Sequence, residues 1–307
     1  MDKTYIEIVR LLLESAPAIF ETPHFAMKGG TAINLFIEDM PRLSVDIDVV
    51  FVDYQATRDN ALKSISSGIE VARKRLSQAG TEAEVSSTKD GDEIKLFIRR
   101  GRNQVKVEVN HVFRGTVLPV EMRRLGEAAR ELFTTELSVP VLATPELYGS
   151  KLVAAMDRQH PRDLFDVRGL FGRGGITADV IECFVCYLAG HNRPVHEVLF
   201  SRDQDMSLAF ENEFAGLTIN PVTLEELRQV RRRLKKELSA ALTANQRQFP
   251  FGLVTGEPDW TLMKCPHLSQ LPAIRWKLQN LARLKKSNPS KFVQQAEELR
   301  GKFAGGV

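Results

Sequence analysis

The chain has 307 residues, with 43% hydrophobic residues, 26% charged residues, three cysteines and a net charge of +3. This composition is that of a globular protein, so it excludes a fibrous or wholly disordered chain, and the length predicts one composite body or two domains. So few cysteines exclude a disulfide scaffold and suit a reducing compartment. We find neither a membrane-spanning apolar run nor a secretory signal, and we therefore expect a cytoplasmic protein without a membrane partner.

The first 143 residues alternate between helix and strand patterns. Apolar spacing predicts an N-terminal helix that ends before Pro17, a short strand that leads into Gly29-Gly30, and then an apolar helix. The remaining elements predicted for this part are a strand over 45–52, a helix over 59–79, strands over 82–87, 93–99 and 104–110, and weaker strands over 117–120 and 138–142. The pattern indicates a mixed, partly antiparallel sheet with helices, that is, an α/β fold class.

From residue 144 the pattern is helical throughout. Thr144-Pro145-Glu146 has the residues of a helix start, and Thr223 with Glu226 is a capping box. The predicted helices are 145–158, 163–171, 177–189, 203–214, 223–243, 272–286 and 289–303. We therefore expect two domains, an α/β core over 1–143 and an α-helical half over 144–307. We interpret Cys183 and Cys186 as buried helix residues, and Trp260 and Trp276 as packing anchors.

The net charge hides an uneven distribution. Residues 228–307 carry 16 Lys and Arg against 5 Asp and Glu, a net charge of +11, whereas residues 1–227 carry 26 against 34, a net charge of −8. The run Arg228–Lys236 coincides with an apolar helical stripe, which predicts that its basic side chains cover the outer face of a helix. A basic segment of this kind favours a polyanionic partner such as RNA, but a solvated helix face explains it equally well.

Two carboxylates interrupt the strand over 45–52. Asp46 and Asp48 are separated by one residue, so on a strand both side chains leave the same face. Two such carboxylates repel one another unless a cation lies between them, and oxygen ligands suit Mg²⁺ rather than zinc. Glu108 would join them if its strand neighbours theirs. The alternative for an isolated Asp-x-Asp is an ordinary solvated strand face.

Gly29, Gly30 and Thr31 form the turn between the preceding strand and helix. Such a turn leaves backbone N–H groups free at the positive end of a helix, where a phosphate group can bind. The alternative is a plain turn. A glycine turn, a helix and an Asp-x-Asp strand within one short stretch are together more specific than either motif alone.

A second polar cluster lies on the predicted helices that follow residue 144. Lys151 and Arg158 share a helix face, and Asp163 and Asp166 lie one turn apart on the next helix. Lys151 suits a point charge against triphosphate oxygens or an acid for the leaving group. The alternative is a set of surface ion pairs, such as Arg158 with Asp163, each of which contributes only a few tenths of a kcal/mol.

These motifs resemble the polymerase-beta-type nucleotidyltransferases, in which a Gly-Ser or Gly-Gly turn and a helix precede two acids on a strand. More narrowly, KGGTAIN, RLSVDIDVVF, VKVEVN and the later K-x₂-A-x₃-R-x₃-RDLFD resemble, in order over roughly residues 27–170, the AbiEii/AbiGii (MenT-like) family of nucleotidyltransferase toxins. This resemblance implies a polymerase-beta-like core followed by a helical half that caps the nucleotide cleft.

The resemblance also implies roles for individual residues. Asp46 and Asp48 take the positions of the metal-binding acids, and the Gly29–Thr31 turn takes the phosphate-binding position. Lys151 takes the position of the essential lysine, which also contacts nucleotide, and Asp166 that of the downstream acid, with Asp163 as its competitor. Glu108 is assigned as a third metal ligand.

The family implies a Mg²⁺- or Mn²⁺-dependent toxin of a bacterial toxin–antitoxin or phage-defence system. It would transfer nucleotides from an NTP to an acceptor, the 3′ end of tRNA being our leading expectation, and so block translation. Its expected partners are an NTP, an RNA acceptor and an antitoxin encoded nearby. The alternatives are a nucleotidyltransferase that acts on a small molecule or a protein hydroxyl, and a nucleotide- or RNA-binding scaffold without catalysis.

Overall fold

The computed structural model describes residues 3–87 and 93–304. The chain divides into two compact units. Unit 1 comprises the residues up to Leu147 together with Ala215–Pro221, and unit 2 comprises Tyr148–Phe214 and the residues from Val222 onward. The separate roles that we predicted for residues 1–143 and 144–307 stay a prediction.

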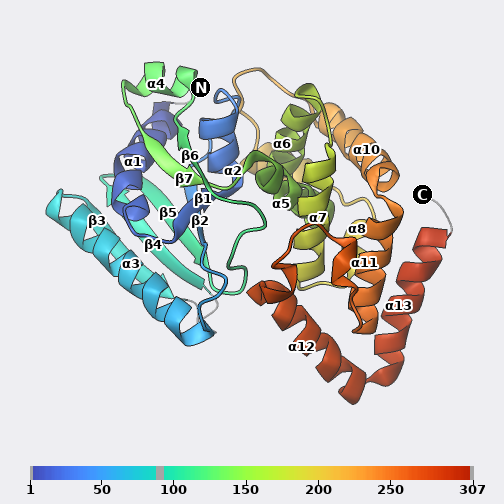
Figure 1. The fold of residues 1–307 in the computed structure, drawn as a ribbon. Coiled ribbons are helices and arrows are strands. Elements are labelled where there is room, and N and C mark those ends of the chain that lie inside the picture. Colours follow the sequence, from blue (N-terminus) through green and yellow to red (C-terminus); the bar gives the residue numbers. More distant parts are fainter. Residues whose placement is uncertain (1–2, 88–92, 305–307) are drawn as a thin grey trace. The chain divides into compact units, whose positions relative to one another are not determined.

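A mixed seven-stranded sheet forms the centre of unit 1 as far as the chain is described (Figure 1). Its strands are β1 (Phe25–Lys28), β2 (Asp46–Phe51), β3 (Glu82–Ser87), β4 (Glu93–Arg100), β5 (Asn103–Asn110), β6 (Glu121–Arg124) and β7 (Ser138–Val141), in the order β3-β4-β5-β2-β1-β7-β6. The β2–β5 and β1–β7 pairs are parallel, and the other pairs are antiparallel. The predicted α/β class with a partly antiparallel sheet is confirmed.

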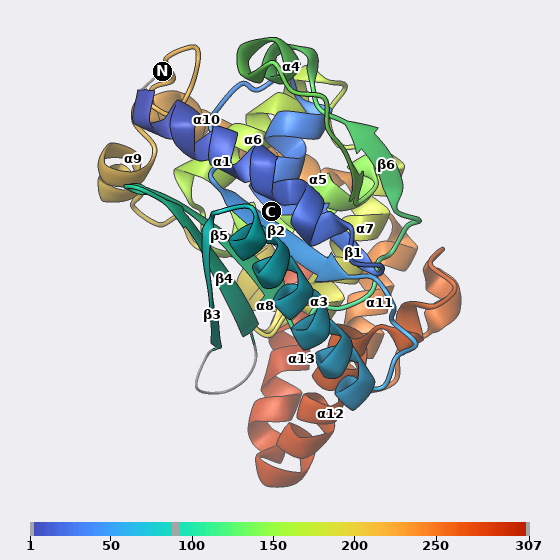
Figure 2. The same ribbon diagram turned by 90° about the vertical axis from the view of Figure 1, so that its left-hand side faces the viewer.

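The helices of unit 1 are α1 (Lys3–Phe20), α2 (Gly29–Ala32), the π-helical turn η1 (Ile33–Ile37), α3 (Arg58–Gln78) and α4 (Glu127–Phe133). Figure 2 shows α1 and α3 lying across one face of the sheet. We predicted that α1 ends before Pro17, and this is wrong, because the helix continues through Pro17 to Phe20. Ala16 and Ile19 are fully buried, so their packing outweighs the hydrogen bond that proline removes.

The strand predicted over 117–120 is also wrong. The backbone N–H groups of Val117 and Leu118 donate to the two carboxylate oxygens of Glu146, at 2.8 and 2.9 Å, so a side chain takes the place of a neighbouring strand. Glu146 is fully buried, and these two bonds compensate for the loss of its hydration. The strand of this region, β6, begins at Glu121.

Unit 2 is helical throughout its described residues. Its helices are α5 (Thr144–Asp157, whose first turn belongs to unit 1), α6 (Pro161–Gly172), α7 (Ala178–Gly190), α8 (Val195–Leu199), α9 (Ser207–Glu213), α10 (Leu224–Ala241), α11 (Ala244–Thr255), α12 (Pro272–Ser287) and α13 (Pro289–Ala304), with 3₁₀ turns η2 (Trp260–Leu262) and η3 (Leu268–Gln270). Every residue of α7 from Val180 to Ala189 is buried, which makes α7 the central helix of this unit. Cys183 and Cys186 are among these residues, as predicted.

In unit 2 one predicted helix start is confirmed, and two helices were not predicted. The capping box of Thr223 and Glu226 is confirmed at the start of α10. The sequence pattern missed α8 and α11, and α11 contains Pro250 in its interior. Thr243 and Gln246 form a second capping box that starts α11, a signal that the sequence does contain. Of the helices in the described residues, none is long and apolar enough to cross a bilayer.

Candidate active site

Asp46 and Asp48 lie on one face of β2, as their spacing predicts. Both side chains are partly exposed, whereas Ile47 between them is fully buried on the opposite face. Asp48 is paired with Lys28 of β1 on one side and with Glu108 of β5 on the other. Because β2 and β5 are parallel neighbours, the structure places Glu108 beside the Asp-x-Asp pair.

The glycine turn is packed directly against Asp48. Gly29 has a φ of +76°, and a Cβ added to it would lie 2.1 Å from Asp48 Oδ2. Only glycine therefore allows both this backbone conformation and the approach of the carboxylate. A Cβ at Gly30 would lie 2.7 Å from Nη2 of Arg42, so a buried guanidinium lies against the other side of the turn.

Thr31 connects the turn to the strand that carries the two acids. Its hydroxyl is hydrogen-bonded to the Ser44 hydroxyl at 2.8 Å and donates a short hydrogen bond to the backbone carbonyl of Asp46. The Thr31 side chain is 1% exposed, so it holds the turn and the strand together within unit 1. The backbone N–H of Thr31 is one of the groups that we predict to bind phosphate.

Glu108 is held by two lysines. Its Oε1 lies 3.0 Å from Lys106 Nζ and 3.2 Å from Lys95 Nζ, and Lys106 Nζ lies 3.9 Å from Asp46 Oδ1. Partial burial raises the pKa of Glu108, but the hydrogen bonds and charges of Lys106 and Lys95 outweigh it and bring this pKa below its ordinary value. Glu108 is therefore ionised and neutralised by lysines, which opposes a metal role for it.

In unit 2, Lys151 lies between two buried aspartates. Its Nζ is 2.9 Å from Asp163 Oδ1 and 3.0 Å from Asp166 Oδ2, and all three residues are at most 6% exposed. Arg158 donates two hydrogen bonds to Asp163, at 2.6 and 3.0 Å. The pair of Arg158 with Asp163 that we expected as an alternative thus exists, but it joins an exposed arginine to a buried carboxylate that also contacts Lys151.

This Lys151 cluster (Lys151, Arg158, Asp163 and Asp166) contains two positive and two negative groups. Burial raises the pKa of Asp163, but Lys151 and Arg158 outweigh burial and hold this pKa well below its ordinary value. The cluster has the charge balance that ionised side chains need inside a protein. The structure thus brings Lys151, Asp163 and Asp166 together in unit 2, and the glycine turn, Asp46, Asp48 and Glu108 together in unit 1.

Comparison with known families gives this arrangement a context. The family model described as "Nucleotidyl transferase AbiEii toxin, Type IV TA system" matches residues 10–280. The chain belongs to this family. The protein is thus a nucleotidyltransferase toxin of a type IV toxin–antitoxin system, which confirms the predicted family and implies an NTP substrate and an antitoxin partner. No curated protein matches the sequence.

The fold of this protein is similar to that of a toxin of known structure. MenT4, a nucleotidyltransferase toxin from Mycobacterium tuberculosis H37Rv, superposes with a TM-score of 0.61 over 92% of this chain and 95% of its own. The two sequences are 19% identical, so this likeness concerns the fold. It confirms a nucleotidyltransferase-like architecture with a helical C-terminal half.

A divalent cation of the kind that nucleotidyltransferases use fits the donors on β2. Among the described residues, no group of three or more His, Cys, Asp and Glu side chains could hold a metal ion, so the protein offers a carboxylate pair. Mg²⁺ is commonly held in this way, by one or two carboxylates together with water and substrate phosphates. The Asp48 side chain makes no hydrogen bond or ion pair with any described residue, and its Oδ2 lies against the glycine turn that we predict to bind phosphate.

Several residues of unit 1 had no individual role in the sequence prediction. Arg42 and Ser44 entered only as part of the family resemblance, yet Arg42 is buried against Gly30 and Ser44 bonds Thr31. Lys106 was missed altogether. The alternation in VKVEV puts Lys106 on the same strand face as Glu108, and that signal was available in the sequence.

Proposed function

We propose that this AbiEii-family protein transfers a nucleotide from an NTP to the 3′ end of tRNA and thereby blocks translation. The approach of Asp48 to Gly29 supports the transfer reaction, because a carboxylate that can bind a metal ion then lies beside backbone N–H groups that can bind a phosphate. The alternative acceptors, a small molecule and a protein hydroxyl, are outcomes of the experiment below.

In this proposal Asp46 and Asp48 hold Mg²⁺ or Mn²⁺. When bound, the metal ion supplies positive charge against the triphosphate oxygens. The backbone N–H groups of the Gly29–Thr31 turn donate to the same phosphate chain, and the Thr31 hydroxyl keeps this turn in register with Asp46. Arg42, buried under Gly30, adds a fixed positive charge below the turn.

We assign the second set of roles to Lys151 and Asp166, as the family resemblance implies. Lys151 would carry the positive charge that a triphosphate requires, and Asp166 would be the downstream acid, with Asp163 as its competitor. Both acids contact the lysine: Lys151 Nζ lies 2.9 Å from Asp163 Oδ1 and 3.0 Å from Asp166 Oδ2, and Asp163 is also held by Arg158.

The basic charge of unit 2 supports an RNA acceptor, but the two basic helices of the segment over 228–307 differ in how much of that charge is exposed and unpaired. On α10 the expectation of an outer basic face is wrong for Arg231, which is 7% exposed and donates to Gln159 and to the Gln204 carbonyl. Its neighbours Arg232 and Arg233 are exposed but paired with glutamates. Most of the basic side chains of α10 therefore form hydrogen bonds or ion pairs within the protein.

The basic side chains of α12 are different. Four of them are exposed and form no ion pair with any described residue, namely Arg275, Arg283, Lys285 and Lys286. Trp276, which we expected to be a packing anchor, is 46% exposed, with Arg283 stacked 5.7 Å from its ring centre. An exposed aromatic ring among unpaired cations is the combination that binds single-stranded RNA ends.

The test is incubation of the full chain with each α-labelled NTP, Mg²⁺ and total tRNA, followed by electrophoresis. We expect labelled tRNA, and we expect Asp46→Asn and Asp48→Asn to reduce labelling by about 10²- to 10³-fold. Asp59→Asn, the same chemical change on the exposed start of α3, is the matched control and should leave labelling unchanged. Label on the protein or on a small molecule would replace tRNA as the acceptor.

A second pair of variants tests the RNA surface. Neutralising Arg283, Lys285 and Lys286 of α12 to Gln should weaken tRNA binding and lower its salt dependence. Neutralising Arg232, Arg233 and Lys236 of α10 removes the same charge from the same unit and should have a much smaller effect. Equal effects of the two triple variants would show that only net charge matters and would remove α12 as the RNA surface.

A further inference from the structure

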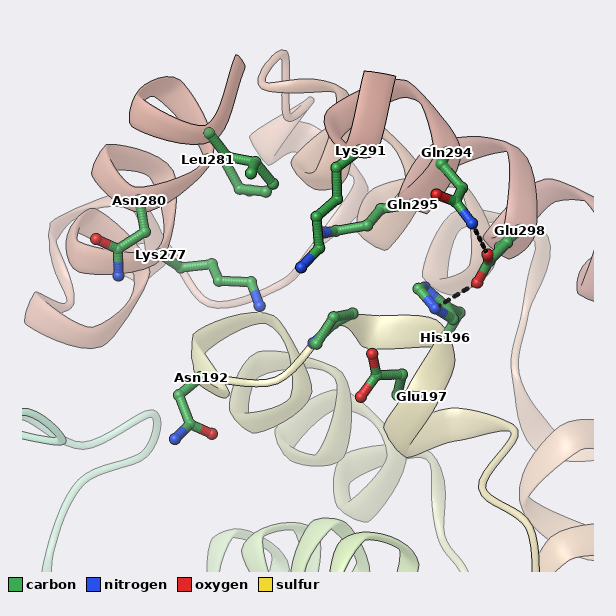
Figure 3. A pocket seen from close by; sticks show the side chains of 12 residues that line it. Asn192, His196, Glu197, Lys277, Asn280, Leu281, Lys291, Gln294, Gln295 and Glu298 are labelled. Atoms are coloured by element: carbon green, nitrogen blue, oxygen red, sulfur yellow. Dashed lines mark hydrogen bonds and ion pairs between the residues drawn. The ribbon is translucent and has the colours of Figure 1, made fainter. Parts of the chain in front are cut away.

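A cavity of about 390 Å³ lies in unit 2 among α8, α12 and α13 (Figure 3). It belongs to none of the sites described above. Its wall includes two lysines, Lys277 of α12 and Lys291 of α13, together with the amides of Asn280 and Gln295. In Figure 3 the amino groups of Lys277 and Lys291 project toward the same space.

Lys277 is the buried group of this cavity. It is 7% exposed, and its ammonium donates to the backbone carbonyls of His191 and Arg193, at 2.9 and 2.7 Å. An ammonium has three N–H groups, so one remains for the cavity. No carboxylate forms an ion pair with Lys277 among the described residues, although burial of an unpaired ammonium is costly.

The carboxylates in the wall are engaged by other groups. Glu298 is bonded to His196 at 2.7 Å and accepts from Gln294 at 2.8 Å. Glu197 is paired with Arg193 at 3.0 Å. Lys277 and Lys291 therefore form no ion pair within the described part of the chain. Two ammonium groups that face one cavity repel one another unless an anion lies between them.

Burial also acts on the protonation of Lys277. It lowers the pKa of this side chain from 10.5 to about 8, and the charge of Glu197 opposes the shift. Lys277 is still protonated at neutral pH, so the cavity presents a cation that is poorly hydrated. Such a group gains most from a charge-assisted hydrogen bond to a ligand.

We propose that this cavity is a binding site for a phosphate dianion, either inorganic phosphate or the terminal phosphate of a small molecule. Lys277 and Lys291 bind the phosphate oxygens as two point charges, which matches the two negative charges of the ligand. Asn280 and Gln295 supply amide donors and acceptors for the remainder of a phosphorylated small molecule. The site is separate from the nucleotide-transfer chemistry assigned to Asp46 and Asp48.

The test is calorimetric titration of the full chain with inorganic phosphate at constant ionic strength. We expect saturable binding of one phosphate. Lys291→Ala removes an exposed lysine, so the protein stays folded, and it should weaken binding by about tenfold or more, the loss of one charge-assisted hydrogen bond. Lys236→Ala, at an exposed position on α10 outside this cavity and outside the proposed RNA surface, is the matched control and should bind like the wild type.

Lys277→Met should abolish phosphate binding, and circular dichroism establishes whether this variant is folded. If it is not, Lys291→Glu, which reverses the charge at an exposed position, takes its place. Ribose 5-phosphate distinguishes the two sources of phosphate, since tighter binding than inorganic phosphate indicates a phosphorylated small molecule. The proposal is overturned by the absence of saturable binding, by unchanged affinity in Lys291→Ala, or by acetate competing as well as phosphate.

Discussion

The charged groups on β2 and β5 and those of the Lys151 cluster differ in how their charges are stabilised. On the sheet, Asp46 and Asp48 are partly exposed, and the Asp48 side chain forms no hydrogen bond or ion pair with any described residue. In unit 2, Lys151 and the two aspartates are buried and bonded to one another. Water stabilises the charges of Asp46 and Asp48 and would leave both side chains accessible to a metal ion and a phosphate. The buried charges of the Lys151 cluster are stabilised by one another.

This difference predicts that substitutions in the two places fail for different reasons. Under the proposed function, Asp46 and Asp48 would contribute to binding and chemistry, and their substitution would have little effect on folding. A member of the Lys151 cluster contributes to folding as well, because its removal leaves an uncompensated charge inside the protein.

Lys151→Met should have the largest effect on stability. It removes the buried cation that contacts both Asp163 and Asp166, so we expect the free energy of unfolding to fall by about 3–5 kcal/mol. Urea denaturation measures this change. Asp46→Asn should stay within about 0.5 kcal/mol of the wild type, as expected for an accessible position. Similar losses in the two variants would remove the distinction between the two regions.

Lys277 is a third case, a buried cation without a carboxylate of its own. Its pKa is lowered from 10.5 to about 8, so between these pH values the unfolded chain binds a proton that the folded chain does not. Stability should therefore rise with pH over this range, by about 3 kcal/mol in total. Denaturation of wild type and Lys277→Met between pH 7.5 and 10.5 isolates this contribution. A difference between the two proteins that does not change with pH would contradict it.

Gly29→Ala tests how closely the glycine turn is packed against Asp48. The new Cβ would strain a backbone at φ +76° and clash with the Asp48 carboxylate. We expect a loss of about 1–2 kcal/mol from the backbone alone and a further loss from the clash, together with loss of nucleotide transfer. Gly80→Ala has the same φ with open space around it, so it measures the backbone effect by itself. Equal destabilisation in both variants would mean that Asp48 moves aside freely.

Glu108→Gln should have the smallest effect, because this carboxylate is partly exposed and screened by water. Lys106 and Lys95 overcome burial and lower its pKa, so its contribution is present above pH 4.5 and is lost as the pH falls through the lower folded value. In Glu108→Gln, the free energy of unfolding should therefore fall slightly less than in the wild type as the pH is lowered below 4.5. Glu127→Gln, at an exposed position on α4, should not show this difference. If stability below pH 4.5 changes with pH in Glu108→Gln as it does in the wild type, the ion pairs of Glu108 with Lys106 and Lys95 do not stabilise the fold.

Local patterns in the sequence determined the features that depend on neighbours along the chain. The alternation around Asp46 and Asp48 correctly predicted a strand with both acids on one face, and the capping residues of α10 correctly predicted its start. Helix α1 departs from its local pattern at Pro17 because burial of Ile19 outweighs the signal of one residue.

Tertiary structure decided which of these features meet. The parallel pairing of β2 with β5 brought Glu108 beside Asp48, and the antiparallel pairing of β4 with β5 brought Lys95 to Glu108. Helix packing buried Arg231 and Lys277 and left Trp276 exposed, although each lies on a helix whose stripe was visible. The sequence by itself determines the family, the acidic strand and the order of most elements, because those signals are local. Solvation and the pairing of charges depend on contacts between residues far apart in the chain, and only the folded structure decides them.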